Sequence, residues 1–290
     1  MNMTVRTTAL LAVILLQVGL PAGAAVAQDW RAAPDSAAPA PATGPTYADI
    51  AGLADLSALV VRARISKLTR VENARAPGLM PGFGRFYVKA KTQALISGKV
   101  PVGESLSYLV DLKLDAKGKP PQLKKREVLL FARPVPGRPG ELQLVSPGAQ
   151  LLAQPETERL VRGVLTELLA PGATPKVTGI REIIHVPGNL AGEGETQIFL
   201  STASQSAASI TVRHQPGGAP QWGASFSELV ADVSRRPQRD TLEWYRLACF
   251  LPNALPAGSN LSDGAVNRRQ AEADYRMVLG TLGECRRTLP

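Results

Sequence analysis

Residues 59–71 read LVVRARISKLTRV, and the alternation within this run decides the fold of the first half of the chain. Val61, Ala63 and Ile65 alternate with Arg62 and Arg64, which is the period of a strand with one buried face. We therefore expect a half-buried β-strand whose outward side is basic.

Further runs downstream extend this pattern. Residues 85–96 and 105–112 alternate apolar with polar or basic side chains, and residues 141–145 repeat the alternation over a shorter length. Residues 127–133 (EVLLFAR) are apolar on both faces, as a central strand would be. Pro- and Gly-rich segments separate the runs. Five β runs joined by turns predict a small barrel or sandwich.

The order of three stretches, ADLSALVVRARI, KAKTQALISGKVPVGESLSY and EVLLFARPV, resembles netrin-like, OB-type barrels of exported bacterial proteins over residues 47–150. Such barrels act as binding or inhibitory modules more often than as enzymes, so the resemblance implies a binding role. The chain departs from the OB pattern at residues 115–126, which leave no room for the helix that usually follows the third strand. In the stretches GNLAGEGETQIFL and WYRLACFLP the mature chain also resembles uncharacterised exported bacterial proteins. This second resemblance does not indicate any particular activity.

The second half is predicted to contain a linking helix, a second set of strands and a helical C-terminus. Residues 155–169 (PETERLVRGVLTELL) begin with proline and carry an apolar stripe at helical spacing. Four β runs follow, and helices are expected near 240–250 and 263–282. The fold class is therefore α+β and β-rich. The expected divisions are a signal peptide (1–27), a disordered Ala/Pro tether (28–46), a barrel-like domain (47–150), the linking helix with a second β subdomain (151–236) and a C-terminal helical hairpin (237–290).

The first residues have the order of a secretory signal peptide. Arg6 precedes an apolar run at 9–20, and Ala25 to Ala27 supply the small residues of a cleavage site. The apolar run is shorter than the roughly 20 residues that span a bilayer. We expect cleavage after Ala27, no transmembrane anchor in the mature chain, and a periplasmic or secreted location. A buried N-terminal helix is the alternative.

Cysteine content and charge agree with an exported protein. Cys249 and Cys285 are the only cysteines, and in an oxidising compartment they are expected to form one disulfide that joins the C-terminal helices. Two free thiols are the alternative. The net charge of +9 favours anionic partners such as envelope lipids, acidic polysaccharide or nucleic acid, although solubility alone would also account for it.

Catalytic and metal motifs are weak. His185 and His214 are the only histidines, which excludes an all-histidine zinc site, and we expect both at strand ends on the surface. Residues 223–227 (GASFS) half-match a nucleophile elbow, and a Ser225–His214–Asp232 triad can be written. The strand–turn–helix context of that elbow is missing, so we expect Ser225 to point outward. A carboxylate pair for glycoside hydrolysis stays open with no two acids singled out. We expect no cofactor and no metal.

The basic outward side of the first two strands is the best candidate site. If these strands pair, their basic residues share one side with an aromatic residue, and a basic loop can extend it. The candidate ligand-binding residues are Arg62, Arg64, Tyr87, Lys89, Lys91, Lys124, Lys125 and Arg126. OB-type barrels bind oligonucleotides or oligosaccharides on such a surface, but stacking aromatics are scarce here and nucleic acid is disfavoured. The alternative is a solvated edge kept positive against strand stacking.

These observations predict a non-enzymatic, exported binding or interaction module of the cell envelope. Its basic face would engage an anionic ligand or a partner protein. The competing hypothesis is a periplasmic hydrolase that uses an acid pair or Ser225. A concave site with convergent polar groups would favour the enzyme, and a convex basic face would favour the module.

Overall fold

The computed structural model describes residues 44–229, 232–233 and 235–289, and these described residues belong to one compact unit. The predicted signal peptide and residues 28–43 of the predicted tether lie outside the described residues. No helix within the described part of the chain is both long enough and apolar enough to cross a bilayer.

A capping box starts the first helix, α1 (Tyr47–Leu56). The Thr46 hydroxyl accepts a hydrogen bond from the Asp49 backbone N–H, and the Asp49 carboxylate accepts one from the Thr46 backbone N–H. These two bonds satisfy donors that a helix N-terminus otherwise leaves unpaired. Ile50 and Leu53 are buried, so α1 packs its apolar side into the core.

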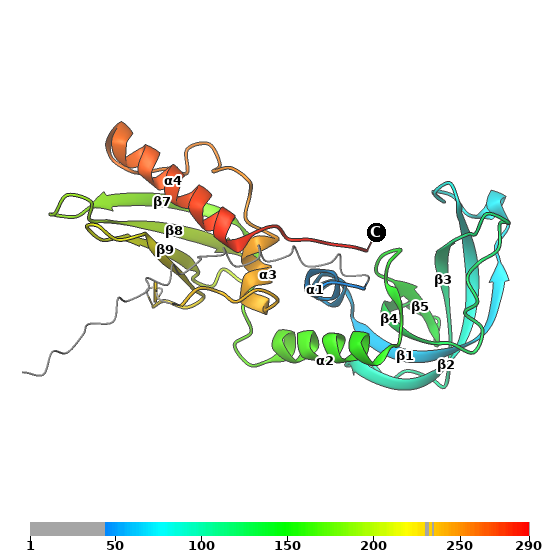
Figure 1. The fold of residues 1–290 in the computed structure, drawn as a ribbon. Coiled ribbons are helices and arrows are strands. Elements are labelled where there is room, and N and C mark those ends of the chain that lie inside the picture. The colour runs from blue at the N-terminus through cyan, green and yellow to red at the C-terminus, as the bar shows by residue number, and fades with distance from the viewer. Residues whose placement is uncertain (1–43, 230–231, 234, 290) are drawn as a thin grey trace, which may run out of the picture. The chain divides into compact units, whose positions relative to one another are not determined.

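The next five strands close into a barrel, which decides between the predicted barrel and sandwich (Figure 1). The strand order is β1-β2-β3-β5-β4, and pairing of β1 with β4 closes it. All neighbours are antiparallel except β3 and β5, which run parallel. The strands are β1 (Leu59–Arg70), β2 (Phe83–Gly98), β3 (Ser105–Lys113), β4 (Glu127–Pro134) and β5 (Glu141–Leu144). The five predicted runs are therefore confirmed.

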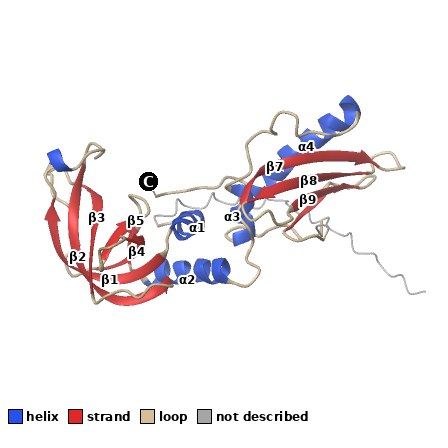
Figure 2. Ribbon diagram, turned by 180° about the vertical axis from the view of Figure 1, so that it is seen from behind, coloured by secondary structure: helices blue, strands red, loops and turns tan. Residues whose placement is uncertain are grey.

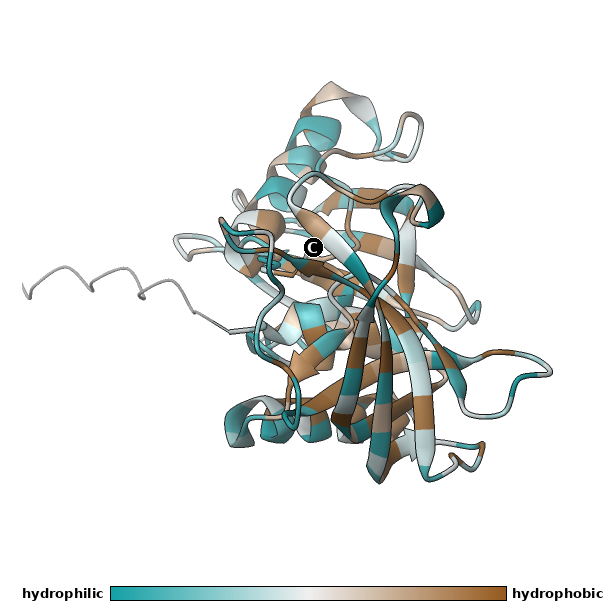
Figure 3. Ribbon diagram, turned by 90° about the vertical axis from the view of Figure 1, so that its right-hand side faces the viewer, coloured by the Kyte–Doolittle hydropathy of each residue, from teal (hydrophilic) through white to brown (hydrophobic). Residues whose placement is uncertain are grey.

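The apolar residues of the predicted alternation fill the barrel interior. Val61, Ala63 and Ile65 of β1 are fully buried, and they pack in one cluster with inward residues of the other strands such as Phe86 and Val88. Figure 3 shows the same alternation as hydrophobic and hydrophilic bands along the strands. Two short elements were not predicted, because three residues show no period: the 3-10 turn η1 (Asn73–Arg75) and β6 (Gln150–Leu152), which pairs with β4.

A helix and a second, fully antiparallel sheet follow the barrel. The helix α2 (Pro155–Leu169) has the predicted bounds, and Val161, Val164 and Leu165 form its buried stripe. The sheet has the order β10-β9-β8-β7. Its strands are β7 (Val177–Pro187), β8 (Gly194–Thr202), β9 (Ser209–His214) and β10 (Gln221–Ser225).

The C-terminal residues, expected to form a helical hairpin, contain two helices. The first contacts α1 and α2, and the second contacts the second sheet. The short helix α3 (Leu242–Ala248) begins at the N-cap Thr241, and the long helix α4 (Gly264–Leu282) lies along one face of the second sheet (Figures 1 and 2). Cys249 and Cys285 are joined, with their Cα atoms 5.1 Å apart, so the predicted disulfide is confirmed. The last residues run back to α1, where the Thr288 N–H donates to Asp49.

Candidate functional sites

Arg62 and Arg64 lie on the outer side of β1, and both form ion pairs with one glutamate. The Glu127 carboxylate accepts from Arg62 Nε at 2.9 Å and from Arg64 Nη2 at 2.6 Å, and Glu158 of α2 accepts from Arg62 Nη1 at 3.3 Å. The hydrogen bond from Arg64 is the largest effect that holds the pKa of Glu127 below its ordinary value. These arginines therefore link β1 to β4 and α2. Because Glu158 also pairs with Arg162 at 2.7 Å, the three arginines exceed the two carboxylates by one positive charge.

Lys89 and Lys91 of β2 are exposed and face other cations. The register places Lys89 opposite Lys67 of β1, and Lys91 opposite Arg64. Among the described residues, no carboxylate lies within ion-pair distance of either lysine. Like charges directly opposite each other destabilise an antiparallel pair. The Lys67–Lys89 pair is thus a local electrostatic conflict that the fold itself does not relieve.

The position of these lysines does not fit the edge-protection alternative. β2 has β1 on one side and β3 on the other, and Lys89 and Lys91 fall within both pairings. A strand that is paired on both sides presents no free edge for another molecule to join. Protection against strand stacking is therefore not the reason for the positive charge of Lys89 and Lys91.

The basic turn before β4 lies beside β1. The Lys125 N–H donates to the Ile65 carbonyl at 2.8 Å, and the Ile65 N–H donates to the Arg126 carbonyl at 2.9 Å. Lys125 has a positive φ of 68°, which lets the chain turn here. All three side chains of the turn are exposed. We call the combined surface the basic strip, which consists of Lys67, Lys89, Lys91, Lys124, Lys125 and Arg126.

Tyr87, two residues along β2 from Lys89, lines a groove of about 630 Å³ on the outer side of the barrel. The groove exists because β3 and β5 separate after a short parallel pairing that ends at Tyr108 and Leu142. Leu109 of β3, 50% exposed, gives the groove an apolar surface next to Tyr87.

The charged side chains in the groove are already paired. Arg85 donates to both carboxylate oxygens of Asp111 at 2.7 and 2.8 Å, and this bidentate contact raises the pKa of the guanidinium. Arg138 in the turn before β5 contacts Glu141 at 3.3 Å. The groove is therefore apolar and internally neutral, whereas the neighbouring basic strip carries uncompensated charge.

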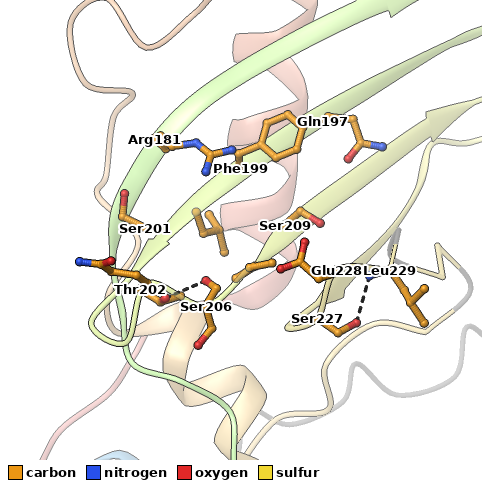
Figure 4. Close-up of a pocket in the computed structure, with 14 residues that line it drawn as sticks. Arg181, Gln197, Phe199, Ser201, Thr202, Ser206, Ser209, Ser227, Glu228 and Leu229 are labelled. Carbon is orange, nitrogen blue, oxygen red and sulfur yellow. Dashed lines mark hydrogen bonds between the residues drawn. The ribbon is translucent and has the colours of Figure 1, made fainter.

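A second pocket of about 680 Å³ lies on the face of the second sheet that α4 leaves open (Figure 4). The Arg181 guanidinium lies over the Phe199 ring, 5.3 Å from its centroid, and contacts Glu182 at 3.2 Å. Ser227 and Glu228 line the opposite side. The Gln197 amide is held by Glu195 and Thr211. The arginine and the glutamine of this pocket are therefore already held by neighbouring side chains.

His185 is buried and His214 is half-buried beside it, so the expectation that both lie at the surface is wrong. His214 Nε2 is 2.9 Å from Asp274 Oδ1, and the Thr196 hydroxyl donates to Asp274 Oδ2. The hydroxyl oxygen of Thr196 is also 2.8 Å from His185 Nδ1, which acts as the donor because the Thr196 proton is already used. Asp274 comes from α4, and sequence periodicity did not indicate that α4 would cover these strand ends.

Burial is the largest effect on the pKa of His185. His185 is 7% exposed, and its burial lowers its pKa, although the nearby Asp274 carboxylate acts in the opposite direction. Glu195, which precedes Thr196 on β8, pairs with Arg213 at 3.0 Å on the other face of the sheet. Within the described residues, no group of three or more His, Cys, Asp or Glu side chains is placed to hold a metal.

Ser225 and His214 do not form a catalytic pair. Ser225 lies opposite Ser209 at the start of β9, whereas His214 is the last residue of that strand and is bound to Asp274. The Ser225 hydroxyl is 3.1 Å from the Ser227 hydroxyl. The triad written from the sequence is therefore not assembled, and the position of Ser225 does not favour a nucleophilic role.

Sequence reasoning missed Lys67 and the groove. A register shift between Ile65 and Lys67 places Lys67, rather than Ser66, opposite Lys89 on the outer side of the barrel. Strict alternation of side chains does not predict such a β-bulge. The groove depends on where the β3–β5 pairing ends, which no local pattern encodes.

The chain matches no family model and no curated protein.

Proposed function

We propose that the protein is an exported, non-enzymatic binding module of the cell envelope whose barrel engages an anionic ligand or partner through the basic strip. The observation that carries this proposal is the uncompensated pair of Lys67 and Lys89 on the barrel surface. Sequences tend to break a local rule of stability where function requires it. An anionic ligand would relieve the repulsion between these lysines.

The location of the groove supports the same function. Tyr87 lines the groove and lies two residues from Lys89 on the same side of β2, so a ligand on the strip can also reach the apolar surface around Leu109. Binding sites commonly combine an apolar floor with a few polar or charged groups that set specificity.

The alternative, a periplasmic hydrolase, has less support. Acid–base catalysis needs a nucleophile or water within reach of a base in an open cavity. In the described residues, the Ser225 hydroxyl is not near a histidine, and Asp111 and Glu141 of the groove are each paired with an arginine. A hydrolytic role for the groove would have to break one of these pairs.

Chromatography on heparin tests the charge-based part of the proposal. The mature chain, residues 28–290, is expected to bind at low salt and to elute as ionic strength rises, because each contact with a sulfate or phosphate releases counterions. The double variant Lys89→Gln, Lys91→Gln is expected to elute at clearly lower salt. A matched control removes two exposed lysines off the strip, Lys99→Gln and Lys117→Gln. Passage of the unaltered chain through the column at low salt, or an equal shift in the control, would contradict the proposal.

Export is tested separately on native material. The signal-peptide pattern and the Cys249–Cys285 bond support it, since disulfides persist in oxidising compartments. Mass spectrometry of the protein from its own cells is expected to find Gln28 as the first residue and the two cysteines oxidised. A chain that begins at Met1 with two reduced thiols would contradict export.

A further inference from the structure

β3 carries a free edge along the groove. Its pairing with β5 is confined to Ser107–Glu141 and Tyr108–Leu142, whereas β3 itself continues to Lys113. Beyond this point the groove separates β3 from β5 and the residues that follow it. The connection from β3 to β4, residues 114–126, contains only turns, so no helix covers the opening.

The backbone of this edge points into the groove. The Ser107 N–H donates to the Gly140 carbonyl on the β5 side, and the Leu114 N–H donates to the Gly82 carbonyl on the β2 side, both at 2.8 Å. Successive residues of a strand direct their N–H groups to alternate sides. The N–H groups of Asp111 and Lys113 therefore point to the side of β3 that β5 leaves unpaired, and Asp111 also lines the groove. No strand of the described chain pairs with either residue on that side.

We propose that an extended segment of a partner protein binds in this groove by adding a strand to the free edge of β3, with an acidic continuation on the basic strip. Strand addition gains affinity from main-chain hydrogen bonds and specificity from contacts to alternate side chains. A saccharide or a lipid headgroup has no regularly spaced amide and carbonyl groups to match this edge. The proposal rests on the proposed function, because the acidic part of the segment would occupy the same lysines.

The surroundings of the edge define the chemistry of the segment. Outward side chains of an added strand would lie near Tyr87 and the half-exposed Leu109, which favours apolar residues at alternate positions. Ser107, at the end of β3 that pairs with β5, lies directly opposite Lys89 of β2. A segment that leaves the free edge before β5 would therefore cross the outer face of β3 to place its continuation on the strip. Carboxylates at that end would face uncompensated lysines, whereas basic residues would be repelled.

Two synthetic peptides separate strand addition from charge attraction alone. One consists of consecutive glutamates, and the other joins the same glutamates to an alternating Thr-Val stretch. We expect the second peptide to bind the mature chain about tenfold more tightly in fluorescence anisotropy, since it adds several main-chain hydrogen bonds. It is also expected to slow amide hydrogen exchange at Asp111 and Lys113, which the first peptide leaves unchanged.

The outcomes distinguish the two proposals. If the glutamate peptide binds and the Thr-Val extension adds neither affinity nor protection, strand addition is wrong and the strip retains its role. If neither peptide binds at low salt, both strand addition and the proposed binding through the basic strip are wrong. If the second peptide binds tightly but protects only other strands, the edge of β3 is not the site.

A pair of variants at Asp111 gives an independent readout. Asp111→Ala and Asp111→Pro both remove the carboxylate that holds Arg85, but only proline removes the N–H that faces the groove. We expect Asp111→Pro to bind the Thr-Val peptide about fivefold more weakly than Asp111→Ala. Both variants are expected to bind the glutamate peptide with the same affinity. If the two variants also bind the Thr-Val peptide with the same affinity, the assignment of the β3 edge is wrong. If Asp111→Pro fails to fold, the exchange measurement on the unaltered protein decides the question.

Discussion

Lys89 lies directly opposite Lys67 across the β1–β2 pair, and no carboxylate of the described residues offsets either charge. Cross-strand pairs of opposite charge stabilise a sheet, and pairs of like charge destabilise it. Lys89→Glu replaces repulsion with attraction, so it is expected to raise the free energy of unfolding by about 0.2–1 kcal/mol. Urea denaturation measures this change.

The same substitution separates stability from binding. Lys89→Glu is expected to weaken heparin retention while it stabilises the fold. Lys99→Glu serves as the control, because Lys99 is exposed in the turn after β2 and has no basic residue opposite it. A stabilisation of the same size in Lys99→Glu would show that the gain reflects net charge rather than the Lys67 contact.

Mild acid is expected to weaken the attachment of α4 to the second sheet. Burial lowers the pKa of His185 below its ordinary value of 6.5, so the unfolded chain binds the proton more readily than the folded chain does. Stability is therefore fully present above pH 6.5 and falls as the pH decreases toward the folded-state value. Thermal unfolding between pH 7 and pH 5 measures the loss.

His185→Gln provides the comparison for this effect. Glutamine keeps a polar group near Thr196 but does not titrate, so the variant is expected to be less stable at pH 7 and to lose less stability on acidification. Equal losses in the two proteins would assign the pH dependence to other groups.

Asp49 joins the first helix to the C-terminal segment. Its carboxylate accepts from the Thr46 N–H at 2.8 Å and from the N–H groups of Thr288 and Leu289 at 3.1 and 3.3 Å. Burial alone would raise the pKa of Asp49, but these hydrogen bonds outweigh burial and the pKa lies below its ordinary value. Asp49→Asn is expected to cost about 1–3 kcal/mol near neutral pH.

The pH dependence of this loss has a definite sign. Because the folded-state pKa is lowered, the contribution of Asp49 is present above its ordinary pKa of 3.8 and disappears as the pH falls through the folded-state value. The stability difference between Asp49→Asn and the unaltered protein should therefore shrink in strong acid. Asp263→Asn is the control, since Asp263 caps α4 without a side-chain hydrogen bond and its loss should cost under about 0.5 kcal/mol.

The elements with strong periodicity were predictable, and the contacts between distant elements were not. Val61, Ala63 and Ile65 identified a strand and its buried face, and the stripe of residues 155–169 identified α2. The convergence of His185 and His214 on Asp274 depends on how α4 packs against the sheet, which neither local pattern encodes.

The candidate site shows the same division. The sequence showed that the first two strands are basic, but it did not show that Glu127 pairs with both Arg62 and Arg64. These ion pairs depend on the pairing of β1 with β4, in which Arg64 and Glu127 lie opposite each other across more than sixty intervening residues. Uncompensated charge is thus a property of the register rather than of composition.

The Cys249–Cys285 bond fixes the segment that follows α4 to the end of α3. Its two cysteines are 36 residues apart in sequence, and in the chain-entropy model a loop of this size stabilises the fold by about 3–4 kcal/mol. Other contacts hold the same segment, including a 2.9 Å hydrogen bond from Trp244 Nε1 to the Leu282 carbonyl. The double variant Cys249→Ala, Cys285→Ala is therefore expected to fold but to unfold at clearly lower urea concentration. The unaltered protein in reductant should unfold together with the variant, whereas coincidence of its reduced and oxidised curves would show that the bond contributes nothing to stability.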